Sequence, residues 1–206
     1  MNSYFFYFFS AILLIIVSGC SNSIPTYDSP NFNKDTRRFQ HPNGDGHNKK
    51  FIDLVGFACK YFSRENDELE KTGFPVIYSS KQKLDSFKEN VIWVGQATIL
   101  LNHDGLTILT DPHFSDRASP FNFWGPKRVT PVPFTIADLP KIDTVLISHN
   151  HYDHLDEKSI TELARLQPQV KFLVPLGLKN LLLEWGAKNV EELDWWKSIK
   201  IEGAEI

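Results

Sequence analysis

Short apolar runs set the pattern of the chain from about residue 91 onward, and they predict β-strands. Val91–Gly95, Ala97–Asn102 and Leu106–Asp111 are brief segments rich in apolar and β-branched residues. The last two are joined by His103-Asp104-Gly105, and Asp-Gly between apolar runs is a strong hairpin signal. We therefore interpret His103 as a turn residue rather than a metal ligand.

Farther along, helical periods alternate with further strand-like runs. Asp156 is placed to cap a helix. The apolar positions of that helix share one face: Ile160, Leu163, Ala164 and Leu166. Val170–Pro175 then predicts a strand, Leu176–Trp185 a helix that Gly186 ends, and Asn189–Leu193 another strand. Strands that alternate with helices predict a layered α/β fold.

The part before residue 91 differs in texture. Ser21–Lys50 is polar and rich in Asn, Asp, Ser, Pro and Gly, which is typical of a flexible tether. Phe51–Phe62 carries apolar residues on one helical face, so we expect a helical extension across residues 51–90. The predicted organisation is a leader (1–20), a tether (21–50), this extension and a main domain (91–206).

The first twenty residues have the form of a secretion signal. Tyr4 to Val17 is apolar apart from Ser10, which is too short for a helix that must cross about 30 Å of bilayer. The segment ends in Val17-Ser18-Gly19-Cys20, which resembles a bacterial lipobox, although no Lys or Arg precedes the apolar run. We expect lipid on Cys20 and a location in the bacterial cell envelope, at the outer membrane or its periplasmic face. An uncleaved apolar anchor or a plain secretion signal is the alternative.

Composition and charge limit the kinds of partner that we expect this chain to bind. The chain has 206 residues, is 42% hydrophobic and 23% charged, and carries a formal net charge of −3. These values are ordinary for a globular domain, and the absence of a basic stripe predicts no nucleic-acid partner. If Cys20 carries lipid, Cys59 is left alone in apolar surroundings, where we expect a buried, inert thiol.

A long segment with little regular pattern runs from Pro112 to Thr135. It holds five prolines, the cations Arg117, Lys127 and Arg128, and five aromatic residues. The aromatic residues are Phe114, Phe121, Phe123, Trp124 and Phe134. Two interpretations stay open: the rings wrap the core, or they line a cleft that faces lipid.

The strongest chemical signal follows the apolar run Val145–Ile147, where three imidazoles and two carboxylates lie within eight residues. Imidazole nitrogen and carboxylate oxygen are zinc ligands. A sharp turn after a buried strand aims the side chains at i, i+2, i+4 and i+5 into one small volume. Two ions can share such a turn, one held by His149 and His151, the other by Asp153 and His154.

This H-x-H-x-D-H pattern after a strand resembles the signature of the metallo-β-lactamase superfamily. Neighbouring motifs resemble the branch that contains N-acyl-phosphatidylethanolamine-hydrolysing phospholipase D and its bacterial relatives, some of them described as RomA-like outer-membrane proteins. These motifs are Trp93–Thr98, Thr110–Pro120, Gly125–Arg128, Val174–Leu178 and Glu192–Trp196. The resemblance runs from about Val91 to Ile206 and more weakly back to Arg37.

The resemblance implies an αββα sandwich, of which this sequence resembles the N-terminal half. Members of the family complete a two-zinc site with later residues: a histidine for the first ion, a bridging aspartate and a last histidine for the second ion. In this sequence no histidine follows His154 before Ile206. We expect a fragment, a frameshifted product or a partial chain, with the missing ligands absent or supplied by a second polypeptide.

The resemblance also implies roles for single residues. Two zinc ions would clamp a phosphodiester and activate a bridging hydroxide, with Asp153 as the catalytic residue that orients the water. Asp111 is the candidate hydrogen-bond partner of a ligating histidine, with a strand-end cap as its alternative role. His113 is not at a ligand position of the family, and Gln96 stands where a histidine is common.

The function implied is that of a lipid-anchored, zinc-dependent phosphodiesterase that releases N-acylethanolamine and phosphatidic acid. Its partners would be a phospholipid substrate and the membrane, and a homodimer is also open. Two alternatives remain. One is a lactonase or other hydrolase on the same scaffold. The other is a truncated, non-catalytic lipoprotein, because four ligands shared by two ions leave each ion with too few.

Overall fold

The computed structural model describes residues 26–41, 56, 75–86 and 88–206. The chain forms two compact units, residues 1–48 and 49–206, which are described separately. The signal segment with Cys20, the helix expected at Phe51–Phe62 apart from Gly56, and Cys59 lie outside the described residues. Among the residues that are described, no helix has the length and apolar character needed to cross a membrane.

The described part of the first unit contains a small hairpin where the composition indicates a tether. Strands β1 (Phe32–Asn33) and β2 (Arg38–Phe39) pair antiparallel, with Phe32 opposite Phe39. The rings of Tyr27, Phe32 and Phe39 lie with their centroids 5.0 to 5.3 Å apart. The tether prediction did not anticipate this hairpin, because its aromatic residues are scattered among polar ones.

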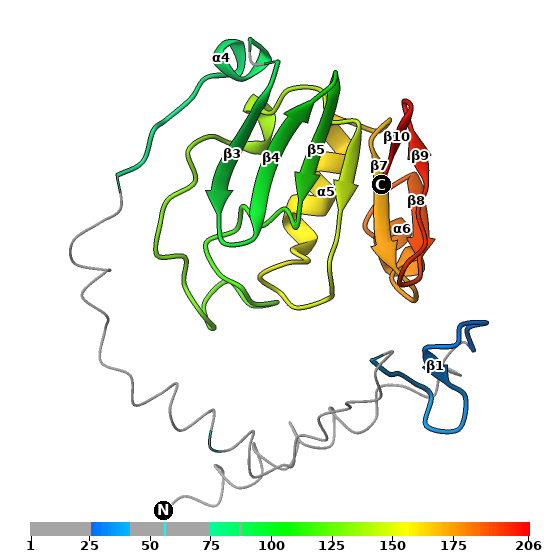
Figure 1. Ribbon diagram of the computed structural model, residues 1–206. Coiled ribbons are helices and arrows are strands. Elements are labelled where there is room, and N and C mark those ends of the chain that lie inside the picture. The colour runs from blue at the N-terminus through cyan, green and yellow to red at the C-terminus, as the bar shows by residue number, and fades with distance from the viewer. Residues whose placement is uncertain (1–25, 42–55, 57–74, 87) are drawn as a thin grey trace, which may run out of the picture. The chain divides into compact units, whose positions relative to one another are not determined.

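A six-stranded mixed sheet organises the second unit (Figure 1). In spatial order its strands are β3 (Asn90–Gly95), β4 (Thr98–His103), β5 (Leu106–Thr110), β6 (Thr144–Leu146), β7 (Lys171–Pro175) and β8 (Asn189–Leu193). The first three strands are antiparallel, and β5 to β8 are parallel. His103 pairs with Leu106 across Asp104-Gly105, so the predicted hairpin is confirmed and His103 ends a strand at its turn.

Two helices connect the parallel strands, which confirms the predicted α/β class. Helix α5 (Glu157–Leu166) follows β6 and lies behind the sheet in Figure 1, and α6 (Lys179–Glu184) follows β7. Helix α6 is shorter than predicted, since Gly177 takes a φ of 94° and the helix begins only at Lys179. Gly186 has a φ of 95° and ends the helix as expected.

Four short elements complete the description of the second unit. The helix α4 (Lys81–Asp85) lies within residues 51–90, where a helical extension is expected. The 3₁₀ turn η1 (Ile136–Asp138) and the paired strands β9 (Lys200–Ile201) and β10 (Ala204–Glu205) were not predicted from the sequence. Each is five residues or shorter, too short to show a hydrophobic period.

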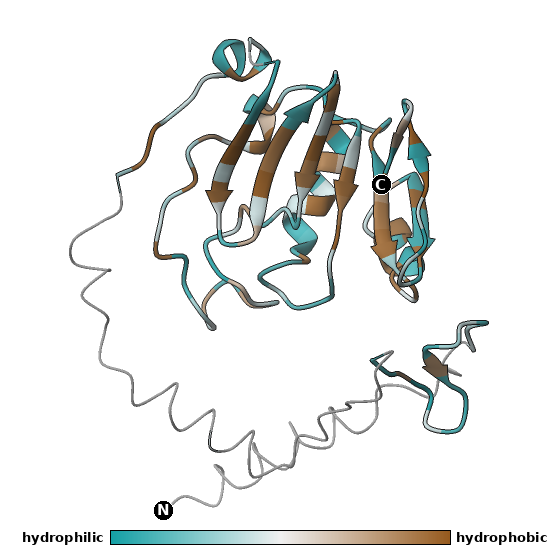
Figure 2. Ribbon diagram, in the orientation of Figure 1, coloured by the Kyte–Doolittle hydropathy of each residue, from teal (hydrophilic) through white to brown (hydrophobic). Residues whose placement is uncertain are grey.

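The core lies between the sheet and α5. Its fully buried side chains include Leu100, Leu109, Val145 and Phe172 from the strands and Ile160 and Leu163 from α5. Figure 2 shows the apolar residues concentrated along the strands and on part of α5. Burial of each such side chain contributes about 1.5–3 kcal/mol. Leu166 departs from the predicted apolar face: it is 38% exposed at the last turn.

The aromatic residues of the segment between β5 and β6 fall into a buried group and an exposed group. Phe134 is buried, Phe114 packs against the core, and their ring centroids are 6.5 Å apart. Phe121, Phe123 and Trp124 are 51%, 83% and 56% exposed. The two ends of the segment therefore wrap the core, whereas its middle presents rings to solvent.

Candidate metal centre

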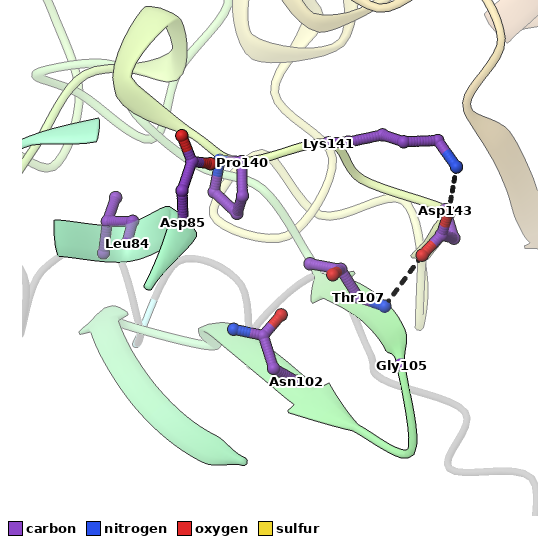
Figure 3. Close-up of a pocket in the computed structure, with 8 residues that line it drawn as sticks. All are labelled: Leu84, Asp85, Asn102, Gly105, Thr107, Pro140, Lys141 and Asp143. Carbon is purple, nitrogen blue, oxygen red and sulfur yellow. Dashed lines mark hydrogen bonds and ion pairs between the residues drawn. The ribbon is translucent and has the colours of Figure 1, made fainter. Parts of the chain in front are cut away.

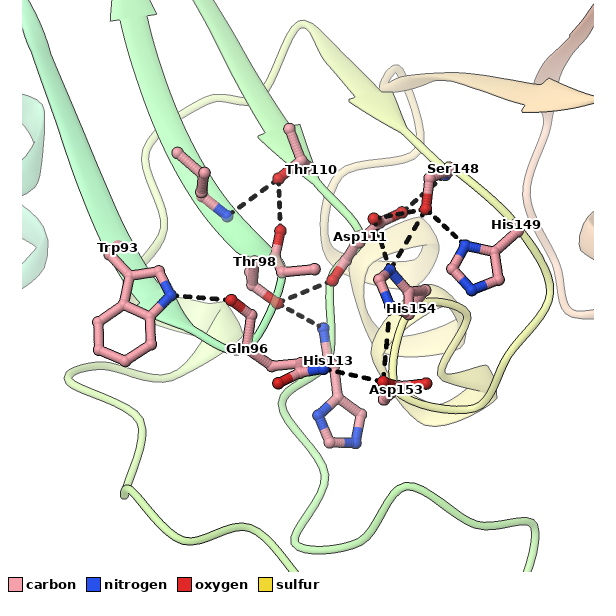
Figure 4. Close-up of polar contacts among 12 residues, drawn as sticks. Trp93, Gln96, Thr98, Thr110, Asp111, His113, Ser148, His149, Asp153 and His154 are labelled. Carbon is pink, nitrogen blue, oxygen red and sulfur yellow. Dashed lines mark hydrogen bonds and ion pairs between the residues drawn. The ribbon is translucent and has the colours of Figure 1, made fainter. Parts of the chain in front are cut away.

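Three chain segments meet at one edge of the sheet (Figure 4). Asp111 directly follows β5, and Ser148 lies two residues after the parallel strand β6. The turn at Gln96 joins β3 to β4 and reaches the same edge, because β4 runs antiparallel to β5. The H-x-H-x-D-H residues follow Ser148, and two of them reach these segments: His154 contacts Asp111, and Asp153 contacts Gln96.

The carboxylate of Asp111 is buried and accepts hydrogen bonds from two residues after β6. The Ser148 N–H donates to Oδ1 over 2.7 Å, and the Ser148 hydroxyl donates to Oδ2 over 2.7 Å. His154 Nδ1 lies 2.8 Å from Oδ2. Asp111 also has a φ of 37°, in the left-handed region that Asp tolerates better than most residues. These contacts are those expected of a carboxylate that orients a ligating histidine.

Counting protons then assigns the tautomers of two histidines. An ionised carboxylate only accepts hydrogen bonds, so His154 carries its proton on Nδ1. Ser148 has one hydroxyl proton and gives it to Asp111, so its Oγ accepts from His149 Nδ1 at 2.9 Å. With the proton on Nδ1, the neutral form of each imidazole has its lone pair on Nε2, the atom that could then bind a metal ion.

The three imidazoles of the motif lie together. The ring centroid of His149 is 4.6 Å from that of His151 and 4.1 Å from that of His154. Burial lowers the pKa of His149, and the neighbouring His154 and His151 lower it further. A lowered pKa favours the neutral imidazole, which is the form that binds metal.

A tight turn brings the last two predicted ligands side by side. The N–H groups of His154 and Leu155 both donate to the carbonyl of His151, over 2.9 and 2.8 Å. His154 Nε2 then lies 3.5 Å from Asp153 Oδ2. Two ligand atoms of one tetrahedral zinc ion are roughly 3.4 Å apart when each bond is about 2.1 Å. The separation in this structure fits that spacing, and the nitrogen and oxygen donors suit zinc.

A second group of possible metal ligands lies at the opposite edge of the sheet, with its ligand atoms close together. Within the described residues, the group whose three ligand atoms all lie within 4.8 Å of one another is Glu89, His103 and Asp104, all exposed. Its Glu89 Oε2–His103 Nδ1 distance is 2.9 Å, and this hydrogen bond raises the pKa of His103. The group is an exposed ion pair with no buried partner, whereas the motif residues are oriented by the buried Asp111.

A hollow of about 280 Å³ also lies at that far edge (Figure 3). It is lined by residues that include Asn102, Gly105 and Thr107, and by the ion pair of Lys141 with Asp143, whose atoms are 2.8 Å apart. None of the motif residues lines it, so the hollow is separate from the candidate metal centre.

His113 is held by contacts with Thr98 and Arg128. Its side chain is buried, its N–H donates to Thr98 Oγ1, and its Nδ1 lies 2.8 Å from Arg128 Nη2. Burial lowers the pKa of His113. Arg128 also donates to the carbonyls of His113 and Ser115, and so ties the long loop to the end of β5.

Asp156 departs from its predicted capping role. It is the residue before α5, but its side chain makes no capping hydrogen bond to the helix backbone. Its carboxylate instead accepts from the N–H and hydroxyl of Ser115, over 3.2 and 3.0 Å, and from the hydroxyl of Ser159. A tertiary contact across 41 residues has replaced the local cap.

Ser148 and Gln96 are the site residues whose contacts sequence reasoning missed. Ser148 links Asp111 to His149 through its hydroxyl. Gln96 Nε2 donates to Asp153 Oδ2 over 2.8 Å. A hydroxyl residue directly before the motif was a signal for the first contact. No local pattern signals the second, which joins residues 57 positions apart.

Comparison with known proteins shows which proteins this chain is similar to. Residues 107–206 match the model of the beta-lactamase superfamily domain. The chain is 43% identical over 111 residues to N-acyl-phosphatidylethanolamine-hydrolyzing phospholipase D 1 of Caenorhabditis elegans, covering 52% of this chain and 31% of that protein. It is 41% identical over 110 residues to the mitochondrial N-acyl-phosphatidylethanolamine-hydrolyzing phospholipase D of Saccharomyces cerevisiae, covering 53% and 23%.

Solved structures resemble the chain at lower sequence identity. A possible metal-dependent hydrolase from Veillonella parvula DSM 2008 is 21% identical, with a TM-score of 0.47, over 58% of this chain and 47% of that one. The chain spans about a third or less of the length of the two phospholipase D relatives.

Proposed function

We propose that the chain, whose residues 107–206 match the model of the beta-lactamase superfamily domain, supplies part of the active site of a zinc-dependent phosphodiesterase that cleaves N-acyl-phosphatidylethanolamine. The metal-dependent hydrolase class follows from the family. The observation that carries the metal assignment is the hydrogen-bond chain Asp111–Ser148–His149, which together with Asp111–His154 leaves two Nε2 atoms free.

The residues around the candidate metal centre have separate roles in this proposal. Asp111 and Ser148 hold the two imidazoles in the tautomer that binds metal. Asp153 offers Oδ2 beside His154 Nε2. Zinc, when bound, supplies positive charge for the phosphodiester oxygens and activates water. As a carboxylate, Asp153 would also accept a hydrogen bond from a water molecule and orient it toward the phosphodiester.

The phospholipid substrate rests on two supports. The first is the likeness to two N-acyl-phosphatidylethanolamine-hydrolyzing phospholipases D, which are 43% and 41% identical over about half of this chain. The second is the middle of the long loop, where the exposed rings of Phe121, Phe123 and Trp124 precede the exposed Lys127. Exposed aromatic rings beside a cation suit an interface with anionic lipid headgroups. A lipid on Cys20 would keep the catalytic unit near that surface.

The test uses the protein as isolated from its source cells, loaded with zinc and checked by elemental analysis. It is given vesicles that contain N-acyl-phosphatidylethanolamine, and phosphatidic acid is measured by mass spectrometry. We expect release of phosphatidic acid, and we expect the His151→Ala variant to lose it because one imidazole ligand is gone. Asn150→Ala, an exposed neighbour, is the matched control.

Three other outcomes would each overturn part of the proposal. Full activity in the His151→Ala variant would remove the role assigned to that imidazole. Faster turnover of lactones than of phospholipid under matched conditions would favour a lactonase. No turnover together with substoichiometric zinc would favour a non-catalytic lipoprotein.

A further inference from the structure

Gln96 occupies a strained position in the turn between β3 and β4. The turn consists of Gln96 and Ala97, and Gly95 pairs with Thr98 across it. Gly95 has a φ of 140° and Gln96 a φ of 52°. Turns with positive φ favour Gly, Asn or Asp, because other side chains crowd the backbone there. A glutamine at this position therefore calls for a contact that offsets the strain.

The structure supplies two contacts that hold Gln96 in place (Figure 4). The indole N–H of Trp93 donates to the Gln96 carbonyl over 2.8 Å. The carboxamide Nε2 donates to Asp153 Oδ2, also over 2.8 Å. The donor must be the NH₂ group, since an ionised carboxylate has no proton to give. Trp93 thus fixes the backbone, and the side chain reaches a residue of the metal motif.

The turn itself is anchored to the sheet and the long loop. Thr110 Oγ1 donates to the carbonyl of Ala97 over 2.8 Å, which ties the turn to the end of β5. A Cβ added at Gly95 would lie 2.8 Å from Arg128 Nη1, so the guanidinium lies close to the backbone of this glycine. With its backbone held on both sides, the turn presents the Gln96 carboxamide from a fixed position.

The oxygen that Gln96 contacts is the one that faces His154. Asp153 Oδ2 accepts from Gln96 and lies 3.5 Å from His154 Nε2, the spacing of two ligands on one zinc ion. An aspartate after a tight turn otherwise has free rotation about two side-chain bonds. The hydrogen bond removes that freedom before any ion arrives.

We propose that Gln96 is a positioning residue that holds Asp153 Oδ2 beside His154 Nε2 for the metal ion those two residues share. The inference rests on the proposed metal centre but not on its substrate. The left-handed backbone of Gln96 is the structural cost of this placement, and such strain is found where function requires it. Groups that orient metal ligands typically affect metal affinity by 10- to 100-fold.

The experiment separates positioning from a purely structural role by substituting Gln96→Gly. Glycine relieves the positive φ, so the metal-free protein should melt at a higher temperature. It also removes the donor to Asp153, so affinity for zinc should fall about tenfold. Zinc affinity is measured on the full chain by competition with a chromophoric chelator, without any substrate. A role in fold stability alone would not give these opposite changes.

Three further variants complete the experiment. Glu202→Gly relieves a similar φ of 47° in the exposed turn between β9 and β10, far along the chain from the motif. It should raise the melting temperature and leave zinc affinity unchanged. Gln96→Met keeps the length of the side chain without the donor and should lose zinc affinity as the glycine variant does. Asp153→Asn removes one carboxylate oxygen, and so tests whether Asp153 is a ligand of the zinc ion whose affinity is measured.

Unchanged zinc affinity in both Gln96 variants would overturn the inference. It would also be overturned if the Asp153→Asn variant bound zinc as tightly as the unmodified chain, because Asp153 would then not be a ligand. Loss of affinity in the Gln96 variants, without any phosphodiester turnover by the unmodified protein, would support the inference and refute the proposed substrate.

Discussion

Replacing Asp111 by asparagine tests the hydrogen-bond chain behind the metal centre. Asparagine keeps the shape of the side chain and tolerates the φ of 37° that Asp111 adopts. It replaces one carboxylate oxygen with an NH₂ donor, which faces the Ser148 hydroxyl and His154 Nδ1. His154 must then accept at Nδ1 and carry its proton on Nε2, which removes the lone pair for the metal ion.

The magnitude follows from the three contacts of Asp111, which are 2.7, 2.7 and 2.8 Å long. Hydrogen bonds to a charged group contribute about 1.5–3 kcal/mol each. Asparagine retains the bond from the Ser148 N–H and can rebuild one of the others in reversed polarity. We therefore expect a net loss of about 2 kcal/mol in the free energy of unfolding, and a 10- to 100-fold loss in zinc affinity.

The assay measures unfolding of the metal-free protein in denaturant and zinc affinity by chelator competition. Asp143→Asn is the matched control, because Asp143 accepts the Thr107 N–H over 2.9 Å at the opposite edge of the sheet. That variant should lose stability and keep its zinc affinity. Undiminished zinc affinity in Asp111→Asn would refute the tautomer assignment.

Three other perturbations have defined outcomes. Burial lowers the pKa of both His113 and His149, so each binds its proton less tightly when folded; thermal melts should show full stability above about pH 6.5 and a decline as the pH falls below it. Gly95→Ala should lower the free energy of unfolding in denaturant by about 1–3 kcal/mol, since its Cβ would lie 2.8 Å from the Arg128 guanidinium. Unchanged stability would contradict the close contact between Arg128 and Gly95. Phe123→Ser should weaken binding to anionic vesicles about tenfold in a sedimentation assay, and should leave the melting temperature unchanged because that ring is 83% exposed.

The sheet was largely predictable because its signals are local. The runs around Val91–Gly95, Val170–Pro175 and Asn189–Leu193 carry their strand pattern within a few residues, and Asp-Gly marks its own hairpin. The candidate ligands were equally visible, since all four lie within six consecutive residues after a strand.

What the sequence did not reveal depends on contacts between distant segments. The bond from Gln96 to Asp153 requires the register of the whole antiparallel part of the sheet to place two residues 57 positions apart. Asp156 sits where local rules expect a helix cap, and yet Ser115 captures its carboxylate. The role of Ser148 follows only from counting its single proton among several acceptors.

Anomalous diffraction at the zinc absorption edge, from crystals of the zinc-loaded protein, tests the central claim most directly. The free Nε2 atoms predict anomalous density beside His149 and His154, and next to Asp153 Oδ2. Density only at the exposed group of Glu89, His103 and Asp104, or none beside the motif, would contradict the assignment of this site as the metal centre of a hydrolase.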